Sequence, residues 1–298
     1  PVILCASPFF MRWMLRSKRI GKYAWCFLNS SKILDVRSTR KGDIIKYLGG
    51  VPQAKNGVLF IDHGYRLERE LSFEIGTDRL FLLNDWRVGG HPVNVPMLNP
   101  HYFYPVCEHA PAKLGKKIFI TVGNVAENTR NLSLLYDVAK AFGNQNRFEI
   151  WCIGRVSEGG DRLNVPSAIK LLGRLSYADM FSRLEMCDYF IPLLDPDVEA
   201  LQMYFNGTTT GSKQLILGFH LVPIIHERFA EVYHFSPDDS IIYPRGAFRE
   251  AFLTALQLSD EEWLKKRDRL AAHAARVYQK SLQNLKEKLE GLAGEGVQ

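Results

Sequence analysis

The feature that most constrains this chain is a regular alternation that begins at Lys116, where each short apolar run is followed by a stretch of helical length. The first run, Lys117-Ile-Phe-Ile-Thr-Val122, is rich in β-branched and aromatic residues. The stretch 130–142 instead places apolar side chains on one face at helical spacing, at Leu132, Leu135, Ala139 and Phe142. Strands that alternate with helices form parallel βαβ units. The pattern therefore predicts a doubly wound parallel sheet.

The same reading predicts the order of the elements along this part of the chain. Strands are expected at 117–122, 148–153, 168–172, 189–193, 222–225 and 240–243. Helices are expected at 130–142, from a Ser176 cap to about Met186, at 212–219, at 227–233 and at 247–257. A long charged helix, capped by Ser259 or Asp260, should then run toward Leu289.

The chain upstream of this region is less regular but is also of α/β type. Strand-like runs occur at 2–5, 32–36, 58–61, 79–83 and 94–98. Four prolines between Pro96 and Pro111 indicate a linker. We therefore predict an abbreviated N-terminal domain at residues 1–105 and a second domain at residues 106–298.

Composition sets limits on the class of protein. With 298 residues and 46% hydrophobic content, the chain is able to bury two cores. Neither a signal peptide nor a membrane-spanning helix is expected, because no apolar run reaches the length that a bilayer requires. Five widely spaced cysteines predict neither a zinc site nor a disulfide framework, and this favours a reducing, cytoplasmic compartment. Cys152 is expected to be a small buried thiol, and the glycosylation patterns at Asn131 and Asn206 are interpreted as chance matches.

The formal charge of +6 is concentrated near the N-terminus. The first 45 residues hold Arg12, Arg16, Lys18, Arg19, Lys22, Lys32, Arg37, Arg40 and Lys41, interleaved with aromatic residues. Two interpretations remain open: a solvated helix face above core aromatics, or a segment that lies peripherally against the inner, anionic face of a membrane. Nucleic acid is not expected as a partner, because no recognised binding motif accompanies the charge.

Ligands of open α/β sheets bind beyond the carboxyl ends of the strands, so the loops there are candidates for chemistry. The loop from Gly123 to Asn131 leaves a strand through glycine and is expected to enter a helix with Arg130 in its first turn. Helix-start amides and an arginine suit phosphate oxygens. If the loop has no function, Arg130 is one more solvated helix residue.

Three further loops follow later strands. They begin at Gly154-Arg155, at Gly173-Arg174-Leu175-Ser176 and at Asp195, and the last continues through Glu199 to Thr210-Gly211-Ser212-Lys213. Its Gly-Ser pair at a helix start presents amides and a hydroxyl to an anion, and Lys213 adds charge. The structural alternatives are ordinary turn glycines and a capped helix with a flexible lead-in.

In the upstream domain, the run Val58-Leu-Phe-Ile-Asp-His-Gly64 places Asp62 and His63 at the end of a strand. His63 is a candidate general base or a hydrogen-bond partner for a substrate hydroxyl, if a carboxylate orients it. The alternative is a structural histidine.

Taken in order, these loops resemble the C-terminal domain of retaining GT-B glycosyltransferases, in the group that includes sucrose synthase-like and bacterial polysaccharide enzymes. The likeness covers about 95–243. It rests on a Pro-Asn entry segment (Val95 to Phe103), Val122-Gly123 with Arg130-Asn131, Ile153-Gly154, Leu172-Gly173, Cys187-Asp188 to Pro192, and Gly211 to Ile225. The resemblance implies a GT-B fold, in which two Rossmann-like domains face a cleft.

The resemblance also implies roles for particular residues. Arg130 and Asn131 would bind the donor diphosphate beside Gly123, while Arg155, Gly173, Arg174 and Leu175 would contact the base, and Thr210, Gly211, Ser212 and Lys213 would hold phosphate or sugar. Glu199 stands for the first of two glutamates common in the family. The second has no counterpart because the helix reads Lys213-Gln214, and Asn124 replaces a common basic residue.

The expected function is transfer of a sugar from a nucleoside-diphosphate sugar, UDP- or GDP-linked, to a hydroxyl of a glycan or lipid-linked acceptor. Retention is expected by analogy, and His63 and Glu199 are the candidate catalytic residues. Neither a metal nor a further cofactor is expected. Three alternatives remain: an inverting enzyme with His63 or Asp62 as the base, a catalytically silent GT-B-like subunit that binds a sugar nucleotide or glycan, and a nucleotide-sugar epimerase.

Overall fold

The computed structural model describes residues 2–5, 58–62, 80–88, 91–92, 95–99, 101, 115–123, 130, 132–143, 147–155, 165–205 and 207–294. Contacts divide the chain into two compact units. The larger unit comprises His101–Asn206 and Thr210–Ala275, and the smaller comprises Pro1–Pro100, Gly207–Thr209 and Arg276–Gln298. The domain boundary expected at residue 105 stays a prediction.

The larger unit is built on a six-stranded sheet in the order β11-β10-β9-β6-β7-β8. Its strands are β6 (Lys117–Val122), β7 (Phe148–Ile153), β8 (Ile169–Gly173), β9 (Tyr189–Phe190), β10 (Val222–His226) and β11 (Ile241–Tyr243). All pairings are parallel. The chain therefore leaves β6 in one direction to β8 and returns to build β9 to β11 on the other side, so strand order reverses between β6 and β9.

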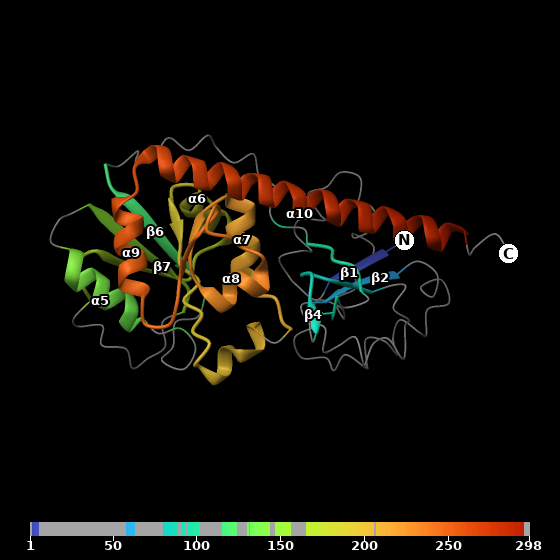
Figure 1. The fold of residues 1–298 in the computed structure, drawn as a ribbon, viewed down its shortest axis with the longest axis horizontal. Helices are drawn as coiled ribbons and strands as arrows, with labels where there is room; N and C mark the ends of the chain where they lie inside the picture. The colour runs from blue at the N-terminus through green and yellow to red at the C-terminus, as the bar shows by residue number, and fades with distance from the viewer. Residues whose placement is uncertain are drawn as a thin grey trace. The chain divides into compact units, whose positions relative to one another are not determined.

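Helices connect these strands, and the last two helices follow β11 (Figure 1). They are α5 (Ser133–Phe142), α6 (Tyr177–Leu184), the 3-10 helix η6 (Glu199–Tyr204), α7 (Gly211–Phe219), α8 (Glu227–Tyr233), α9 (Phe248–Gln257) and α10 (Asp260–Gly294). The predicted α/β class with a doubly wound parallel sheet is confirmed. None of the helices in the described part of the chain is both long and apolar enough to cross a membrane.

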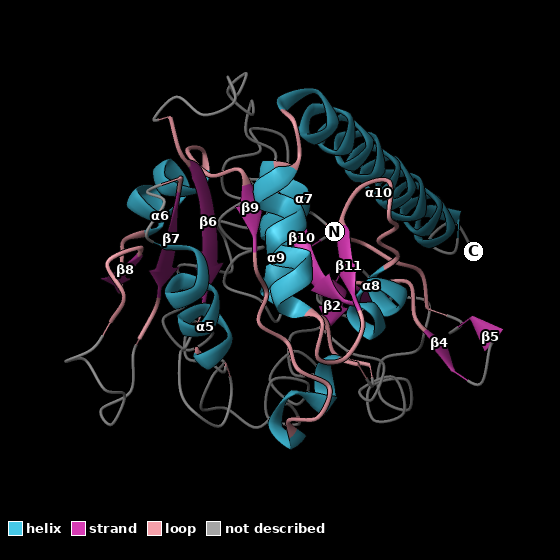
Figure 2. Ribbon diagram, turned by 60° about the vertical axis from the view of Figure 1, so that its left-hand side comes forward, coloured by secondary structure: helices cyan, strands magenta, loops and turns pink. Residues whose placement is uncertain are grey.

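Aromatic packing forms the core of this unit. The Phe119 ring stacks on the Tyr189 ring at 4.8 Å between centroids and lies 4.3 Å from the Phe252 ring. Helices α5 and α9 supply side chains to this same core, and Figure 2 shows them on one side of the sheet. Cys152 is 1% exposed, which confirms the expected buried thiol.

Lys117 ties the first strand of this sheet to the end of α9. Its Nζ donates to the carbonyl oxygens of Ala255 at 2.9 Å, Leu256 at 3.1 Å and Leu258 at 2.6 Å. The last carbonyls of a helix lack partners within the helix, and a cation there is favoured by the helix dipole. The side chain therefore satisfies carbonyl groups at the C-terminus of α9.

The smaller unit contains a parallel sheet in the order β1-β2-β3. Its strands are β1 (Val2–Cys5), β2 (Val58–Asp62) and β3 (Leu80–Leu82), and β4 (Arg87–Val88) pairs with β5 (His91–Pro92) in an antiparallel ribbon. The strand expected at 94–98 is reduced to a bridge between Leu82 and Met97. The strand expected at 32–36 lies outside the described residues.

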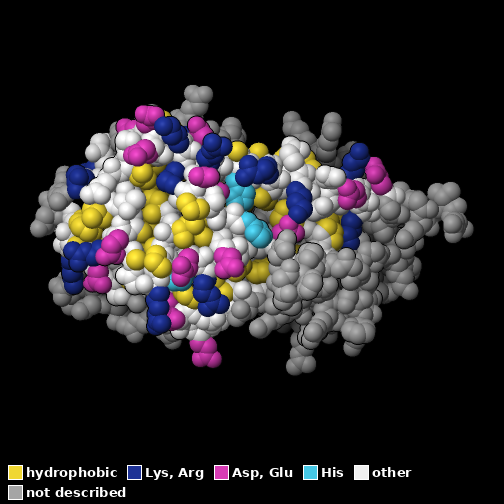
Figure 3. Space-filling view, in the orientation of Figure 1, with side chains coloured by type: hydrophobic (Ala, Val, Ile, Leu, Met, Phe, Trp, Pro, Cys, Tyr) yellow, Lys and Arg dark blue, Asp and Glu magenta, His cyan; other side chains and the backbone are white. Residues whose placement is uncertain are grey.

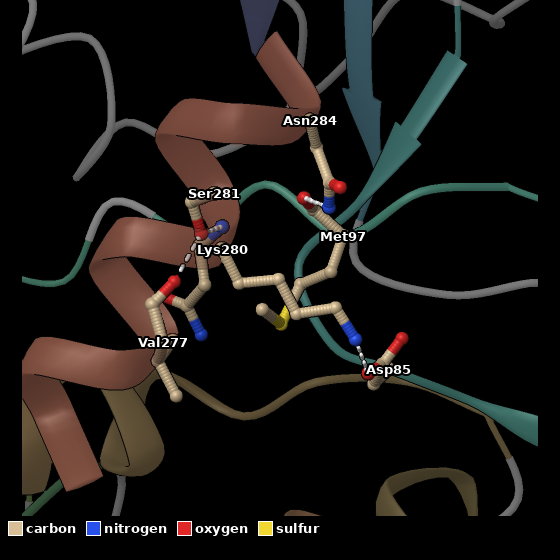
Figure 4. A network of polar contacts seen from close by, with 7 residues as sticks. Asp85, Met97, Val277, Lys280, Ser281 and Asn284 are labelled. Carbon is tan, nitrogen blue, oxygen red and sulfur yellow. Dashed lines mark hydrogen bonds and ion pairs between the residues drawn. The ribbon is translucent and has the colours of Figure 1, made fainter. Parts of the chain in front are cut away.

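The C-terminal part of α10 belongs to the smaller unit and is held there by polar contacts (Figure 4). Ser281 Oγ accepts a hydrogen bond from Asn99 N at 3.0 Å, and Asn284 Nδ2 donates to Met97 O at 2.7 Å. Lys280 pairs with Asp85. The contacts of Ser281 and Asn284 satisfy backbone groups that lie beyond β3.

Candidate functional site

The candidate site lies in the larger unit, at the carboxyl ends of β6, β7 and β8. The backbone joins these ends directly, because Gly123 N donates to Ile153 O at 2.8 Å and Gly154 N donates to Gly173 O at 2.8 Å. The edge between β6 and β9 is the topological switch point, where ligands of doubly wound sheets bind. Two of the predicted site glycines, Gly123 and Gly173, are therefore joined through Gly154 into one continuous backbone edge.

Two of these glycines are required by close packing. Gly123 and Gly154 have φ values of 141° and 142°, in a region that side chains rarely adopt. A Cβ on Gly154 would lie 1.9 Å from the Gly123 carbonyl oxygen, and a Cβ on Gly123 would lie 2.6 Å from Arg130 Cζ. The space beside Gly123 is thus filled by the Arg130 guanidinium.

The sequence predicts Arg130 in the first turn of a helix. Helix α5 begins only at Ser133, so Arg130 lies in the loop before it. Its guanidinium turns back toward the sheet, where Nη1 donates to Val122 O and Nη2 donates to Ser212 Oγ at 3.4 Å. The side chain therefore connects the end of β6 to the start of α7. The sequence predicts that Arg130 and Ser212, on separate loops, both bind phosphate, and the structure brings these two residues together.

The electrostatics of Arg130 favour an anion. Burial lowers the pKa of its guanidinium to about 10, so the group remains charged at neutral pH. No carboxylate pairs with Arg130 in the described part of the chain. A cation that is taken out of water without a negative partner is costly.

The N-terminus of α7 completes the arrangement. Thr210 is the N-cap residue, and its Oγ1 accepts from Ser212 N at 3.3 Å, so the helix begins one residue earlier than the start predicted at Ser212. Tyr233 fixes the segment that precedes α7, because its hydroxyl accepts a hydrogen bond from Thr210 N at 3.2 Å and donates one to Tyr204 O at 2.9 Å. Sequence reasoning missed both tyrosines, since no local pattern pairs residues so far apart.

The remaining predicted residues have different positions. Lys213 is only 1% exposed, and its Nζ lies 5.3 Å from the centroid of the Tyr233 ring. Arg155 and Arg174 are exposed, and Leu175 is half-buried after the positive-φ Gly173. Glu199 is exposed at the start of η6. His63 and Asn131 lie outside the described residues.

On the face that Figure 3 shows, basic and acidic side chains of the described residues are interspersed, and no field of one sign covers them. The described residues contain no cluster of three or more histidine, cysteine or acidic side chains arranged to hold a metal ion.

Comparisons with known proteins give likenesses of fold. No protein-family model and no curated protein sequence matches the chain. Among solved structures, it is similar to an alpha-glucosyltransferase in complex with UDP and a 13-mer DNA containing a central A:G mismatch, at 15% identity and a TM-score of 0.49 over 86% of this chain and 76% of that chain. It is also similar to TarM, at 11% identity and a TM-score of 0.45 over 85% of this chain and 45% of that chain. Both TM-scores lie below 0.5, so the function proposed below rests on this chain's own residues.

Proposed function

We propose that this protein is a GT-B glycosyltransferase whose larger unit binds a nucleoside-diphosphate sugar. The observation that carries the proposal is the position of Arg130, a charged guanidinium without a carboxylate partner among the described residues, 3.4 Å from Ser212 Oγ at the start of α7. The group lies at the switch point of a doubly wound sheet, where nucleotides bind.

The physical argument is one of charge compensation. A partly buried guanidinium and the positive end of the α7 helix dipole both favour an anion in the same place. A diphosphate supplies two negative groups within reach of such donors, and an arginine binds phosphate oxygens bidentately. Binding of the donor diphosphate here relieves the cost of burying the Arg130 guanidinium without a carboxylate partner among the described residues.

The chemistry follows from this position. Transfer breaks the bond between the anomeric carbon and the diphosphate oxygen and forms a bond from that carbon to the acceptor oxygen, whose proton leaves to a base. Negative charge develops on the departing diphosphate, where Arg130 and the α7 amides stabilise it. His63 and Glu199 are the residues that we propose for the base and the sugar contact.

Further parts of the proposal come from the resemblance in sequence. We propose a UDP- or GDP-linked donor, a glycan or lipid-linked acceptor, retention at the anomeric carbon and no need for a metal ion. The basic and aromatic N-terminal segment would place the reaction at the cytoplasmic, inner face of a membrane.

The test is a thermal-shift screen with UDP, GDP, ADP, CMP and their sugar derivatives, followed by an assay for release of the nucleoside diphosphate. A ligand that binds only the folded state raises the melting temperature. We expect one nucleotide family to stabilise the protein, and we expect Arg130→Ala to abolish this shift. Arg183→Ala is the matched control, because it removes the same charge in the last turn of α6. No shift with any nucleotide would overturn the proposal.

The alternative is a catalytically silent subunit that binds a sugar nucleotide. The burial of Lys213 favours it, because a lysine that is 1% exposed and packed over Tyr233 does not offer its charge to a ligand as an exposed lysine would. Stabilisation by a nucleotide sugar without release of nucleotide, in the presence of a panel of acceptors, would support this alternative.

A further inference from the structure

Tyr233, the last residue of α8, is fully buried and joins two other segments of the larger unit. Its hydroxyl donates to Tyr204 O, at the end of η6, at 2.9 Å and accepts from Thr210 N, before α7, at 3.2 Å. Burial raises the pKa of Tyr233, so the hydroxyl keeps the proton that it donates. A tyrosine hydroxyl is able to donate one hydrogen bond while it accepts another, so a single group serves both contacts.

The two backbone groups that Tyr233 contacts are the ends of a short loop. Tyr204 is the last residue of η6, and Thr210 is the N-cap of α7. Backbone groups at the ends of helices lack partners within the helix. Between these ends, Gly207 has a φ of 111°, and glycine restricts the backbone less than any other residue. The hydroxyl therefore holds together two ends that the loop itself does not fix.

Both ends of this loop lead to the Arg130 guanidinium. At one end, Thr210 Oγ1 accepts from Ser212 N at 3.3 Å, and Ser212 Oγ accepts from Arg130 Nη2 at 3.4 Å. At the other end, Tyr204 acts on Arg130 through its charge: burial lowers the pKa of Arg130, and an electrostatic interaction with Tyr204 opposes this effect. A displacement of either end therefore reaches the group that we propose binds the diphosphate.

The ring of Tyr233 has contacts of its own, which are separate from those of the hydroxyl. Lys213 Nζ lies 5.3 Å from the centroid of the ring, and the centroid of the Phe229 ring lies 4.3 Å from it. A phenylalanine ring keeps both aromatic packing and the attraction for a cation. The substitution Tyr233→Phe therefore removes the hydroxyl bridge and leaves the ring contacts in place.

We propose that Tyr233 is a positioning residue of the diphosphate site, and this inference rests on the proposed function. Its buried hydroxyl contacts no substrate, but it fixes the start of α7 and the end of η6 before the diphosphate arrives. Without the hydroxyl, the diphosphate would have to order both segments, and ordering of this kind weakens binding. A tyrosine with a purely structural role would instead lower stability and leave the gain in affinity from the phosphates unchanged.

The test compares full-length wild type with Tyr233→Phe by calorimetric titration with UDP and uridine, and with GDP and guanosine. Tyr189→Phe is the matched control, because it also removes a buried tyrosine hydroxyl, one that donates to Ala255 O at 3.0 Å in the core. Amide hydrogen exchange over residues 204–212, measured in the three proteins without nucleotide, reports whether the two segments are fixed.

We expect Tyr233→Phe to bind the nucleoside diphosphate about tenfold more weakly than wild type and the nucleoside within about twofold of wild type. Exchange over residues 204–212 should be faster in this variant alone, and Tyr189→Phe should keep both affinities. An unchanged diphosphate affinity in Tyr233→Phe, an equal loss for the nucleoside, or unchanged exchange overturns the positioning role while the proposed function stands. If wild type binds neither UDP nor GDP, the proposed function itself fails, and the positioning role fails with it.

A double-mutant cycle with Thr210→Ala tests the route of the effect, because the effects of two residues that act through the same segment are not additive. If Tyr233 acts through the start of α7, the two substitutions together should weaken diphosphate binding about tenfold, and not by the roughly fiftyfold that independent effects would give. Independent losses would show that the hydroxyl does not act through α7, and they would overturn the proposal.

Discussion

At the scale of single residues, the site depends on glycines that allow backbones to approach closely. Gly123 and Gly154 have nearly the same φ and lie at the ends of adjacent strands, so each leaves room that the other, or Arg130, occupies. The sequence predicts strands that end in glycine here. It does not show that the space beside these glycines is filled by the Arg130 guanidinium and the Gly123 carbonyl group.

Replacement of Gly154 by alanine should therefore be much more harmful than a standard glycine replacement. The new Cβ meets the Gly123 carbonyl oxygen at 1.9 Å, and neither backbone is able to move without separating β6 from β7. We expect a loss of about 4 kcal/mol in the free energy of unfolding, from strain in φ and overpacking together.

Gly173→Ala is the matched control for this prediction. Gly173 also has a positive φ, 68°, but a Cβ there has nothing within 4 Å. We expect a loss of about 1 kcal/mol, from backbone strain alone. Urea denaturation of the two variants measures the difference in the free energy of unfolding. Equal losses would show that the need for glycine at position 154 does not come from its close approach to Gly123.

At the scale of elements, caps decide where the helices of the site begin. The sequence around α7 offers several cap candidates in a row, Thr208, Thr209, Thr210 and Ser212, and local preference does not distinguish them. Thr210 is the cap because Tyr233, on α8, holds its amide. That contact is non-local, which explains why the predicted start at Ser212 was one residue late.

Removing the Thr210 hydroxyl should weaken both stability and ligand binding. Thr210→Ala should lower the free energy of unfolding by about 1 kcal/mol, the usual value of an N-cap. It should also weaken binding of a nucleoside diphosphate about fivefold, because the α7 amides lose their fixed orientation. Calorimetric titration with the nucleotide chosen by the thermal-shift screen measures this.

Ser176→Ala separates the two effects. Ser176 caps α6 by the same kind of bond, since its Oγ accepts from Asp179 N at 3.1 Å. This variant should lose a similar amount of stability and keep its nucleotide affinity. If both variants lose affinity equally, the effect comes from general destabilisation and not from α7.

The strands show which part of the structure is predictable from sequence. Runs such as 117–122 and 148–153 match β6 and β7 residue for residue, because apolar periodicity and flanking glycines are local signals. The run 189–193 was predicted too long, since the left-handed turn at Leu193 follows soon after β9 ends at Phe190. Arg130 could be chosen from its loop position, whereas its contact with Ser212 depends on the completed sheet.

At the scale of the whole molecule, the buried Asp188 and the partly buried His220 change the free energy of unfolding with pH in opposite directions. Burial lowers the pKa of His220 to about 4 and raises that of Asp188 to about 6. Between pH 6.5 and 4, the unfolded state holds more protons at His220, so this histidine lowers stability as pH falls. Between pH 6 and 3.8, the folded state holds more protons at Asp188, so this carboxyl raises stability as pH falls.

Replacing His220 should therefore remove the loss of stability at acid pH that this histidine causes and leave the effect of Asp188 in place. His220 is the C-cap of α7 with a φ of 50°, and asparagine tolerates this conformation without titrating. We expect His220→Asn to be less sensitive than wild type to acidification from pH 7 to pH 4.5 by about 2 kcal/mol, allowing for partial exposure. Thermal denaturation at both pH values measures this, and a pH dependence equal to that of wild type would show that His220 titrates normally in the folded protein.

The central claim is that Arg130 and the start of α7 hold a diphosphate, and the most direct test compares affinities along a series of one base. Calorimetric titration with the nucleoside, the monophosphate and the diphosphate should show affinity rising at each step in the wild-type protein. In Arg130→Ala the gain from the second phosphate should fall by about tenfold or more, as for the loss of a charged hydrogen bond. Equal affinity for nucleoside and diphosphate, or an unchanged gain in Arg130→Ala, would contradict the claim.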